Sequence, residues 1–191
     1  MSIKFQSYIS EKVKNAKSII VDMDDTLIYT SYANFLSYRM AVYETLGVYL
    51  SHKQESRFTK ETLYRFFPTL CSMLLSDIIS AKNEIFETYL HTTRVNHLLV
   101  NILKRYKDTK QIILLTNSKS TRSIELLKYH SLYKYFDIII YNDPQINSNK
   151  YQTLIDIVDI DIKSCVVLEN EIEQITYAKQ VGIKDTDIIK I

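Results

Sequence analysis

Three carboxylates follow a short apolar run near the start of the chain. Asp22, Asp24 and Asp25 come directly after residues 18–21 and are followed by Thr26. The run predicts a buried strand over 18–23, and ligands bind outside the carboxyl ends of strands in open α/β sheets. A turn there would aim Asp22 and Asp24 at one site, and such a pair suits a divalent cation together with acid–base chemistry. The plainer alternative is an Asx turn or a helix cap.

Polar side chains also follow two later apolar runs. Thr116, Asn117 and Ser118 come after the run 112–115, and they offer a hydroxyl and an amide that are able to hold a phosphoryl oxygen. Thr-Asn-Ser is also an ordinary helix cap. Residues 169–171, Glu-Asn-Glu, come after the run 165–168, where they suit either a metal site or the capping of the next helix. Lys150 opens a predicted helix and, taken alone, is equally compatible with solvated surface.

The elements that must position these residues alternate in the C-terminal half. Further strands are predicted over 112–115, 136–141, 165–168 and, more weakly, 188–191, and helices over 119–131, 150–158 and 171–181. Continuous apolar runs without alternation are typical of strands buried on both faces of a parallel sheet. Residues 29–95 have apolar side chains at helical spacing and no strand-like run. They predict a helical insertion in which Gly47 ends one helix and Pro68 begins another.

Composition excludes several ways of binding phosphate. Only two of the 191 residues are glycine, Gly47 and Gly182, so a Walker loop, a dinucleotide fingerprint and a kinase glycine-rich loop are all absent. The net charge of +2 gives no case for nucleic-acid or membrane binding. No apolar stretch is long enough to span a membrane, and we expect a cytoplasmic protein.

Taken in order, these motifs resemble those of the haloacid dehalogenase-like superfamily. Asp22-Met-Asp24-Asp-Thr26 matches its first motif, DxDx[TV]. Thr116 matches the second motif, Lys150 the third, and Glu169-Asn170 lies where the fourth places its acids. The resemblance implies an α/β, Rossmann-like parallel sheet with strand order 5-4-1-2-3. It assigns residues 1–28 and 96–191 to the catalytic core and 29–95 to an inserted helical cap of the C1 type, as in phosphoglycolate phosphatases and pyrimidine 5′-nucleotidases.

The same resemblance implies a role for each motif residue. Asp22 would be the nucleophile that forms an aspartyl-phosphate, and Asp24 would protonate the leaving group and then activate water. Thr116 and the Asn117 amide would bind phosphoryl oxygens. Lys150 would balance the charge of the nucleophile and of the transferring group.

The resemblance further implies Mg²⁺, bound by the Asp22 carboxylate, the Asp24 backbone carbonyl and the fourth motif, Glu169 with Asn170. Asn170 stands where an Asp is usual, so this ligand is uncharged. Glu169, Glu171 or Glu173 would have to complete the negative charge of the site.

The leading hypothesis is therefore a magnesium-dependent phosphatase acting on a small phosphorylated metabolite. A phosphomutase of the β-phosphoglucomutase kind shares every motif. Asn170 motivates an alternative of another class, a catalytically weak or inactive protein that binds a phosphorylated ligand or partner. The identity of the substrate and the oligomeric state do not follow from the sequence.

Overall fold

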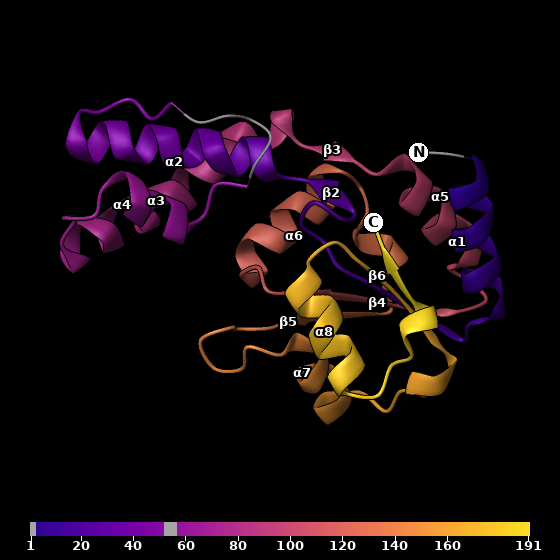
Figure 1. Ribbon diagram of the computed structural model, residues 1–191. Coiled ribbons are helices and arrows are strands. Elements are labelled where there is room, and N and C mark those ends of the chain that lie inside the picture. Colours follow the sequence, from indigo (N-terminus) through magenta and orange to yellow (C-terminus); the bar gives the residue numbers. More distant parts are fainter. Residues whose placement is uncertain (1–2, 52–56) are drawn as a thin grey trace. The chain divides into compact units, whose positions relative to one another are not determined.

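The computed structural model describes residues 3–51 and 57–191. The chain divides into two compact units, one formed by Met1–Ile28 with Val95–Ile191 and the other by Tyr29–Arg94. The first unit contains a parallel sheet with helices, and the second is helical (Figure 1). Within the described residues, no helix is both long and apolar enough to cross a membrane.

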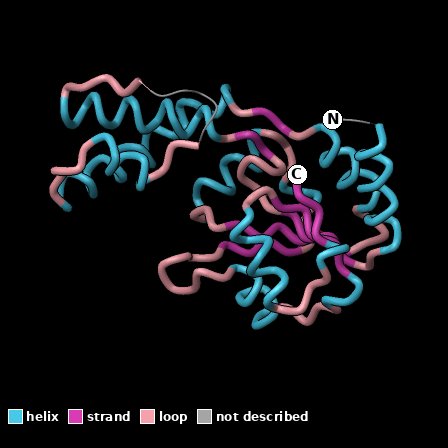
Figure 2. Tube along the Cα trace, in the orientation of Figure 1, coloured by secondary structure: helices cyan, strands magenta, loops and turns pink. Residues whose placement is uncertain are grey.

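A five-stranded sheet with the order β5–β4–β1–β6–β7 forms the centre of the first unit. Its strands are β1 (Ser18–Val21), β4 (Gln111–Thr116), β5 (Ile138–Tyr141), β6 (Cys165–Glu169) and β7 (Ile188–Lys190). All four pairings between neighbours are parallel, and Figure 2 shows the strands running side by side. Numbered along the chain within this sheet, the order is 5-4-1-2-3 from β7 to β5, which confirms the predicted fold class.

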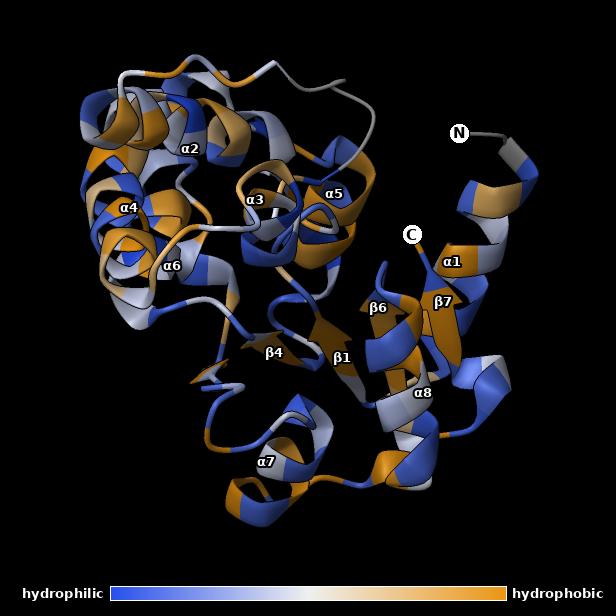
Figure 3. Cartoon of the chain, turned by 60° about the vertical axis from the view of Figure 1, so that its left-hand side comes forward, coloured by the Kyte–Doolittle hydropathy of each residue, from blue (hydrophilic) through white to orange (hydrophobic). Residues whose placement is uncertain are grey.

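Helices cover both faces of this sheet. They are α1 (Ile3–Asn15), α5 (His97–Tyr106), α6 (Ser120–Tyr129), α7 (Lys150–Ile157) and α8 (Ile172–Gln180). Ile20, Ile113 and Val167 project from three adjacent strands into one core cluster with Leu154 of α7 and Ala178 of α8. Their neighbours along each strand point to the opposite face and are buried as well. Burial on both faces explains why the strands are apolar along their length, as Figure 3 shows for β1, β4, β6 and β7.

The second unit packs its helices around an aromatic core of its own. Its elements are α2 (Ser31–Leu46), α3 (Lys60–Phe66), α4 (Ser72–Ile85) and the 3₁₀ helix Phe86–Thr92. Phe58 is fully buried between Phe35 and Tyr38, with ring centroids 5.9 and 5.0 Å away. Gly47 ends α2 with a φ of 69°, as predicted, because glycine adopts this left-handed conformation without strain.

Some local features differ from the sequence-based expectation. Helices α1 and α5 lie where the apolar pattern predicts no element, and the segments that join the two units pair as two short strands, β2 (Ile28–Tyr29) and β3 (Arg94–Val95). Pro68 does not begin a helix: it lies in the turn between α3 and α4, and α4 starts at Ser72. A proline disfavours helical conformation in the residue before it, and Phe67 accordingly leaves the helix with a ψ of 71°.

Candidate active site

Asp22 lies at the carboxyl end of β1 in direct contact with Lys150. The Asp22 amide donates to the Leu168 carbonyl at 3.0 Å and so extends the pairing of β1 with β6 by one residue. Lys150 Nζ donates to Asp22 Oδ1 at 2.6 Å and lies 2.8 Å from Glu169 Oε2. All three side chains are buried. Parallel strands thus bring together three residues that are far apart in the sequence, from the first, third and fourth motifs.

Burial and charge compete in setting the protonation of this cluster. Burial raises the pKa of Asp22 to about 7, although the Lys150 ammonium opposes the shift. Burial by itself lowers the pKa of Lys150, but the carboxylates of Asp22 and Glu169 outweigh it, and its pKa is raised overall. Lys150 therefore remains positively charged at neutral pH, whereas Asp22 is about half-ionised near pH 7 and becomes a full carboxylate only above it.

Glu169 is completely buried, and both of its oxygens are engaged. Oε2 accepts from the Tyr151 hydroxyl at 3.0 Å in addition to its contact with Lys150, and Oε1 accepts from the backbone amides of Asn170 and Glu171 at 3.0 and 3.1 Å. Burial raises the pKa of the Tyr151 hydroxyl well above its usual value, so it remains a donor. In this arrangement Glu169 holds Lys150 in place.

The loop after β1 folds into a tight turn that fixes Asp24. Asp25 has a φ of 57°, in the left-handed region that aspartate tolerates better than most residues. Its amide donates to the Ile28 carbonyl at 2.7 Å. Asn96, where the chain returns from the second unit, donates through its side chain to the Thr26 carbonyl at 3.2 Å and through its amide to the Leu27 carbonyl at 2.8 Å. The loop is thereby held by a hydrogen bond of its own and by the two that Asn96 donates.

Arg122 of α6 forms a bidentate ion pair with Asp24. Its Nη2 donates to Asp24 Oδ1 at 2.6 Å and its Nη1 to Oδ2 at 3.0 Å, while Ser118 Oγ donates to the same Oδ2 at 2.5 Å. Arg122 is a site residue that sequence reasoning missed. No spacing within the sequence marks it, because Ser118 lies before the start of α6 and the partner Asp24 is 98 positions away.

Thr116 and Asn117 stand at the carboxyl end of β4, the other neighbour of β1. Thr116 is buried, and its hydroxyl accepts from the Ser118 amide at 3.1 Å. The Asn117 carbonyl oxygen Oδ1 accepts from the side chain of Asn142, which follows β5, at 2.8 Å. Of the predicted site residues, Asp22, Lys150 and Glu169 are therefore in direct contact, and Asp24 is joined to the segment after β4 through Ser118.

The oxygen donors at this sheet edge fit a magnesium ion with few protein ligands. Among the described residues, no group of three or more His, Cys, Asp or Glu has metal-binding geometry. The Asn170 amide oxygen, however, is buried with no hydrogen-bond partner, and it follows β6, the strand paired with β1. Mg²⁺ accepts one or two protein oxygens and completes its shell with water and substrate phosphate. Asp22 and Asn170 suit such a site, whereas the oxygens of Glu169 already have partners.

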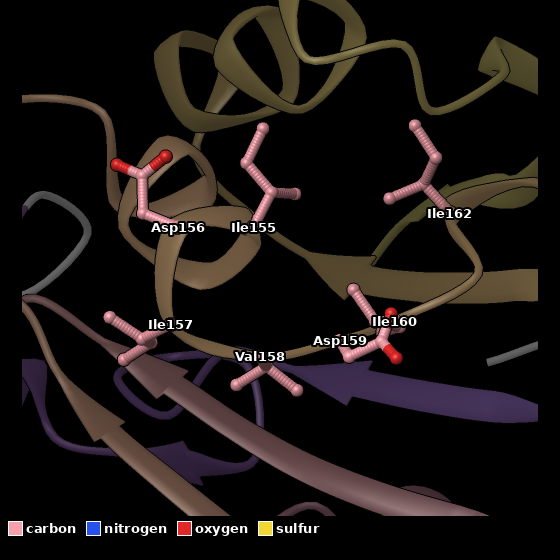
Figure 4. A pocket seen from close by; sticks show the side chains of 7 residues that line it. All are labelled: Ile155, Asp156, Ile157, Val158, Asp159, Ile160 and Ile162. Atoms are coloured by element: carbon pink, nitrogen blue, oxygen red, sulfur yellow. The ribbon is translucent and has the colours of Figure 1, made fainter.

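A separate hollow of about 490 Å³ lies at the opposite end of α7 from Lys150 (Figure 4). It is lined by five apolar side chains and two carboxylates, those of Ile155, Asp156, Ile157, Val158, Asp159, Ile160 and Ile162. It contains none of the motif residues.

Solved structures with this architecture come from several bacteria. A haloacid dehalogenase-superfamily hydrolase of subfamily IA from Geobacter sulfurreducens is 15% identical, with 92% of this chain and 87% of that chain covered and a TM-score of 0.71. CbbY from Rhodobacter sphaeroides, solved in complex with phosphate, is 18% identical, with 88% and 84% covered and a TM-score of 0.70. A haloacid dehalogenase-like protein from Bacillus subtilis, solved bound to magnesium, is 13% identical, with 89% and 87% covered and a TM-score of 0.64.

These similarities show that the chain has the haloacid dehalogenase-like fold, as the motifs implied. No protein-family model and no curated protein matches the sequence.

Proposed function

We propose that this protein is a phosphatase that hydrolyses a small phosphomonoester through an aspartyl-phosphate on Asp22. The observation that carries the proposal is the buried contact of Asp22 with Lys150 at the carboxyl ends of parallel strands. The fold is shared with a haloacid dehalogenase-superfamily hydrolase and with CbbY, which was solved in complex with phosphate. A carboxylate with a fixed cation beside it is suited to attack a phosphate and to tolerate the charge that accumulates.

The first step forms one bond to phosphorus and breaks another. An Asp22 oxygen attacks phosphorus, and the bond between phosphorus and the ester oxygen breaks. The leaving oxygen takes a proton from Asp24, which enters this step protonated, and departs as an alcohol. Lys150 stays on Asp22 and offsets the negative charge, while Thr116 and Asn117 donate to phosphoryl oxygens.

The second step regenerates the enzyme. Water attacks the aspartyl-phosphate, its proton passes to Asp24, and inorganic phosphate leaves from Asp22. For both proton transfers Asp24 must exchange one of its contacts with Arg122 or Ser118 for the reacting oxygen. A Mg²⁺ ion held by Asp22 and Asn170 would supply positive charge that reduces repulsion between the nucleophile and the phosphate dianion.

Asp22→Asn tests the proposal directly. Purified protein is assayed with p-nitrophenyl phosphate, acetyl phosphate and a panel of phosphometabolites, with and without Mg²⁺. We expect turnover by the wild type and a loss of at least a thousandfold in Asp22→Asn, because an amide is not a nucleophile here. Equal activity in the two proteins, or no turnover by the wild type of any ester, would overturn it. Identification of the product as inorganic phosphate separates hydrolysis from a phosphomutase reaction.

Asn170 favours a second candidate, a protein that binds a phosphorylated ligand without turnover. The amide supplies an oxygen but no charge to the cation site. We expect Asn170→Asp to tighten Mg²⁺ binding about tenfold or more, measured by titration calorimetry, because a carboxylate adds a full negative charge. If the wild type is inactive and Asn170→Asp gains turnover, the binding function is the better description. Unchanged Mg²⁺ affinity in Asn170→Asp would show that the cation does not bind at residue 170.

A further inference from the structure

Asn142 is a buried amide at the end of β5 that no motif singled out. The residue is only 5% exposed, and both polar atoms of its side chain have partners. Nδ2 donates to Asn117 Oδ1 and to the Asn147 backbone carbonyl, both at 2.8 Å, and Oδ1 accepts from the Thr153 hydroxyl at 2.7 Å. Its backbone amide donates to the Thr116 carbonyl at 2.8 Å.

These contacts leave one orientation for the amide of Asn142. A backbone carbonyl can only accept a hydrogen bond, so the side-chain nitrogen of Asn142 must face Asn147. The same nitrogen therefore faces Asn117, and the group of Asn117 that meets it must be the acceptor, Oδ1. The NH₂ group of Asn117 is consequently turned away from Asn142.

We infer that Asn142 is a positioning residue that fixes Asn117 as a hydrogen-bond donor toward the phosphate of the substrate. An amide can present either its oxygen or its nitrogen, and only the nitrogen attracts a phosphoryl oxygen. A freely turning Asn117 would present the repelling oxygen part of the time. The inference rests on the proposed function, in which Asn117 binds phosphate.

The network also explains why this orientation is stable. Thr153 Oγ1, which donates to Asn142, accepts in turn from the Asn147 side chain at 3.1 Å, and the Asn147 side-chain oxygen accepts from the Asn149 amide at 3.0 Å. The loop between β5 and α7 is thus fastened to the first turns of α7, the helix that carries Lys150. Reversing Asn142 would cost its two donated hydrogen bonds at once, both of them partly buried, and would place its side-chain oxygen against the Asn147 carbonyl.

Asn142→Asp tests the inference, because an ionised Asp presents only acceptors. Asn117 should then turn its NH₂ group toward residue 142 and its oxygen toward the phosphate. We expect the inhibition constants of inorganic phosphate and vanadate to rise about tenfold, the value of one hydrogen bond to a charged group. The matched control is Thr153→Val, which breaks the network but leaves both contacts of the Asn142 nitrogen. It should change these constants less than twofold.

A double-mutant cycle separates positioning from the added charge of the aspartate. In an Asn117→Ala background, Asn142→Asp should raise the inhibition constant of phosphate by less than a further twofold, because the Asn117 side-chain amide on which it acts is absent. Full additivity of the two substitutions would overturn the inference. Asn142→Leu, which removes the donor without adding charge, serves if Asn142→Asp does not fold, and it should raise the inhibition constant about threefold.

NMR of the Asn117 side chain gives a readout that needs no phosphate. In Asn142→Asp its NH₂ protons should become hydrogen-bonded, with a downfield shift and slower solvent exchange than in the wild type. An unchanged spectrum overturns the inference about Asn142. A wild type that neither binds phosphate nor hydrolyses esters overturns the proposed function instead, so the two failures are distinguishable.

Discussion

Two cations neutralise carboxylates at the candidate site, and they do so differently. Lys150 is a point charge between Asp22 and Glu169, whereas Arg122 donates two hydrogen bonds to the Asp24 carboxylate. A bidentate guanidinium–carboxylate pair is rigid and holds the carboxylate in one orientation. Asp24, the proposed proton donor, is therefore restrained before substrate arrives.

Arg122→Gln should change leaving-group selectivity. Without the guanidinium, Asp24 exchanges partners more readily and binds a proton more tightly, so protonation of a poor leaving group improves. We expect the ratio of activity on an alkyl phosphate to activity on p-nitrophenyl phosphate, whose leaving group needs little protonation, to rise several-fold. Arg122→Lys, which keeps the positive charge but cannot form the bidentate pair, is the control and should have an intermediate effect. An equal change on both substrates would contradict this role.

At the level of elements, α7 holds Lys150 in an electrostatically unfavourable position. Lys150 is the first residue of α7, where the helix dipole is positive and disfavours a cation. The carboxylates of Asp22 and Glu169 compensate for this placement. The N-cap of the helix, Asn149, accepts from the amides of Tyr151 and Gln152 at 3.0 and 3.1 Å and fixes where the helix begins.

Asn149→Ala should therefore affect both stability and the site. Loss of an N-cap costs about 1 kcal/mol of folding free energy, and fraying of the first turn should displace Lys150 and lower kcat. Asn149→Asp keeps the acceptor and should retain stability and activity. Thr59→Ala removes a comparable cap, at α3 in the other unit, and should lower stability in urea unfolding without lowering kcat. A similar loss of kcat in Thr59→Ala would show that the effect is one of stability alone.

For the whole molecule, the buried Asp22 carboxyl links folding to pH. The pKa of Asp22 is about 7 in the folded protein and 3.8 in its ordinary state. Between these values the folded protein binds the proton more tightly than the unfolded chain, so this group makes the protein less stable as pH rises. The full penalty is reached above pH 7, and none remains below pH 3.8.

We expect this contribution to reduce the free energy of unfolding by about 3 kcal/mol from pH 5 to pH 8. Asn at position 22 does not titrate, so the loss should be absent in Asp22→Asn, and other groups cancel when the two proteins are compared. Urea unfolding followed by circular dichroism at both pH values measures the difference. A wild type that gains stability relative to Asp22→Asn over this range would contradict a raised pKa of the buried Asp22 carboxyl.

The sequence by itself determined the strands and the motif positions of this protein. Continuous apolar runs such as 112–115 and 165–168 are typical of parallel strands that are buried on both faces. Residues that follow such strands lie together at the carboxyl edge of the sheet. The order of the motifs was sufficient to indicate the superfamily fold that the structural comparison shows. Helix α1 was not predictable in the same way, because a mostly polar segment gains its helix from burying Ile9 and Val13 against the rest of the unit.

Only the tertiary structure decided which side chains face one another at the site. The partners Arg122 with Asp24, Tyr151 with Glu169 and Asn142 with Asn117 are separated by 98, 18 and 25 positions. No local propensity or spacing encodes such contacts. They arise because parallel strands bring distant loops to the same edge of the sheet, where each buried polar group must find a partner among whatever the fold has placed there.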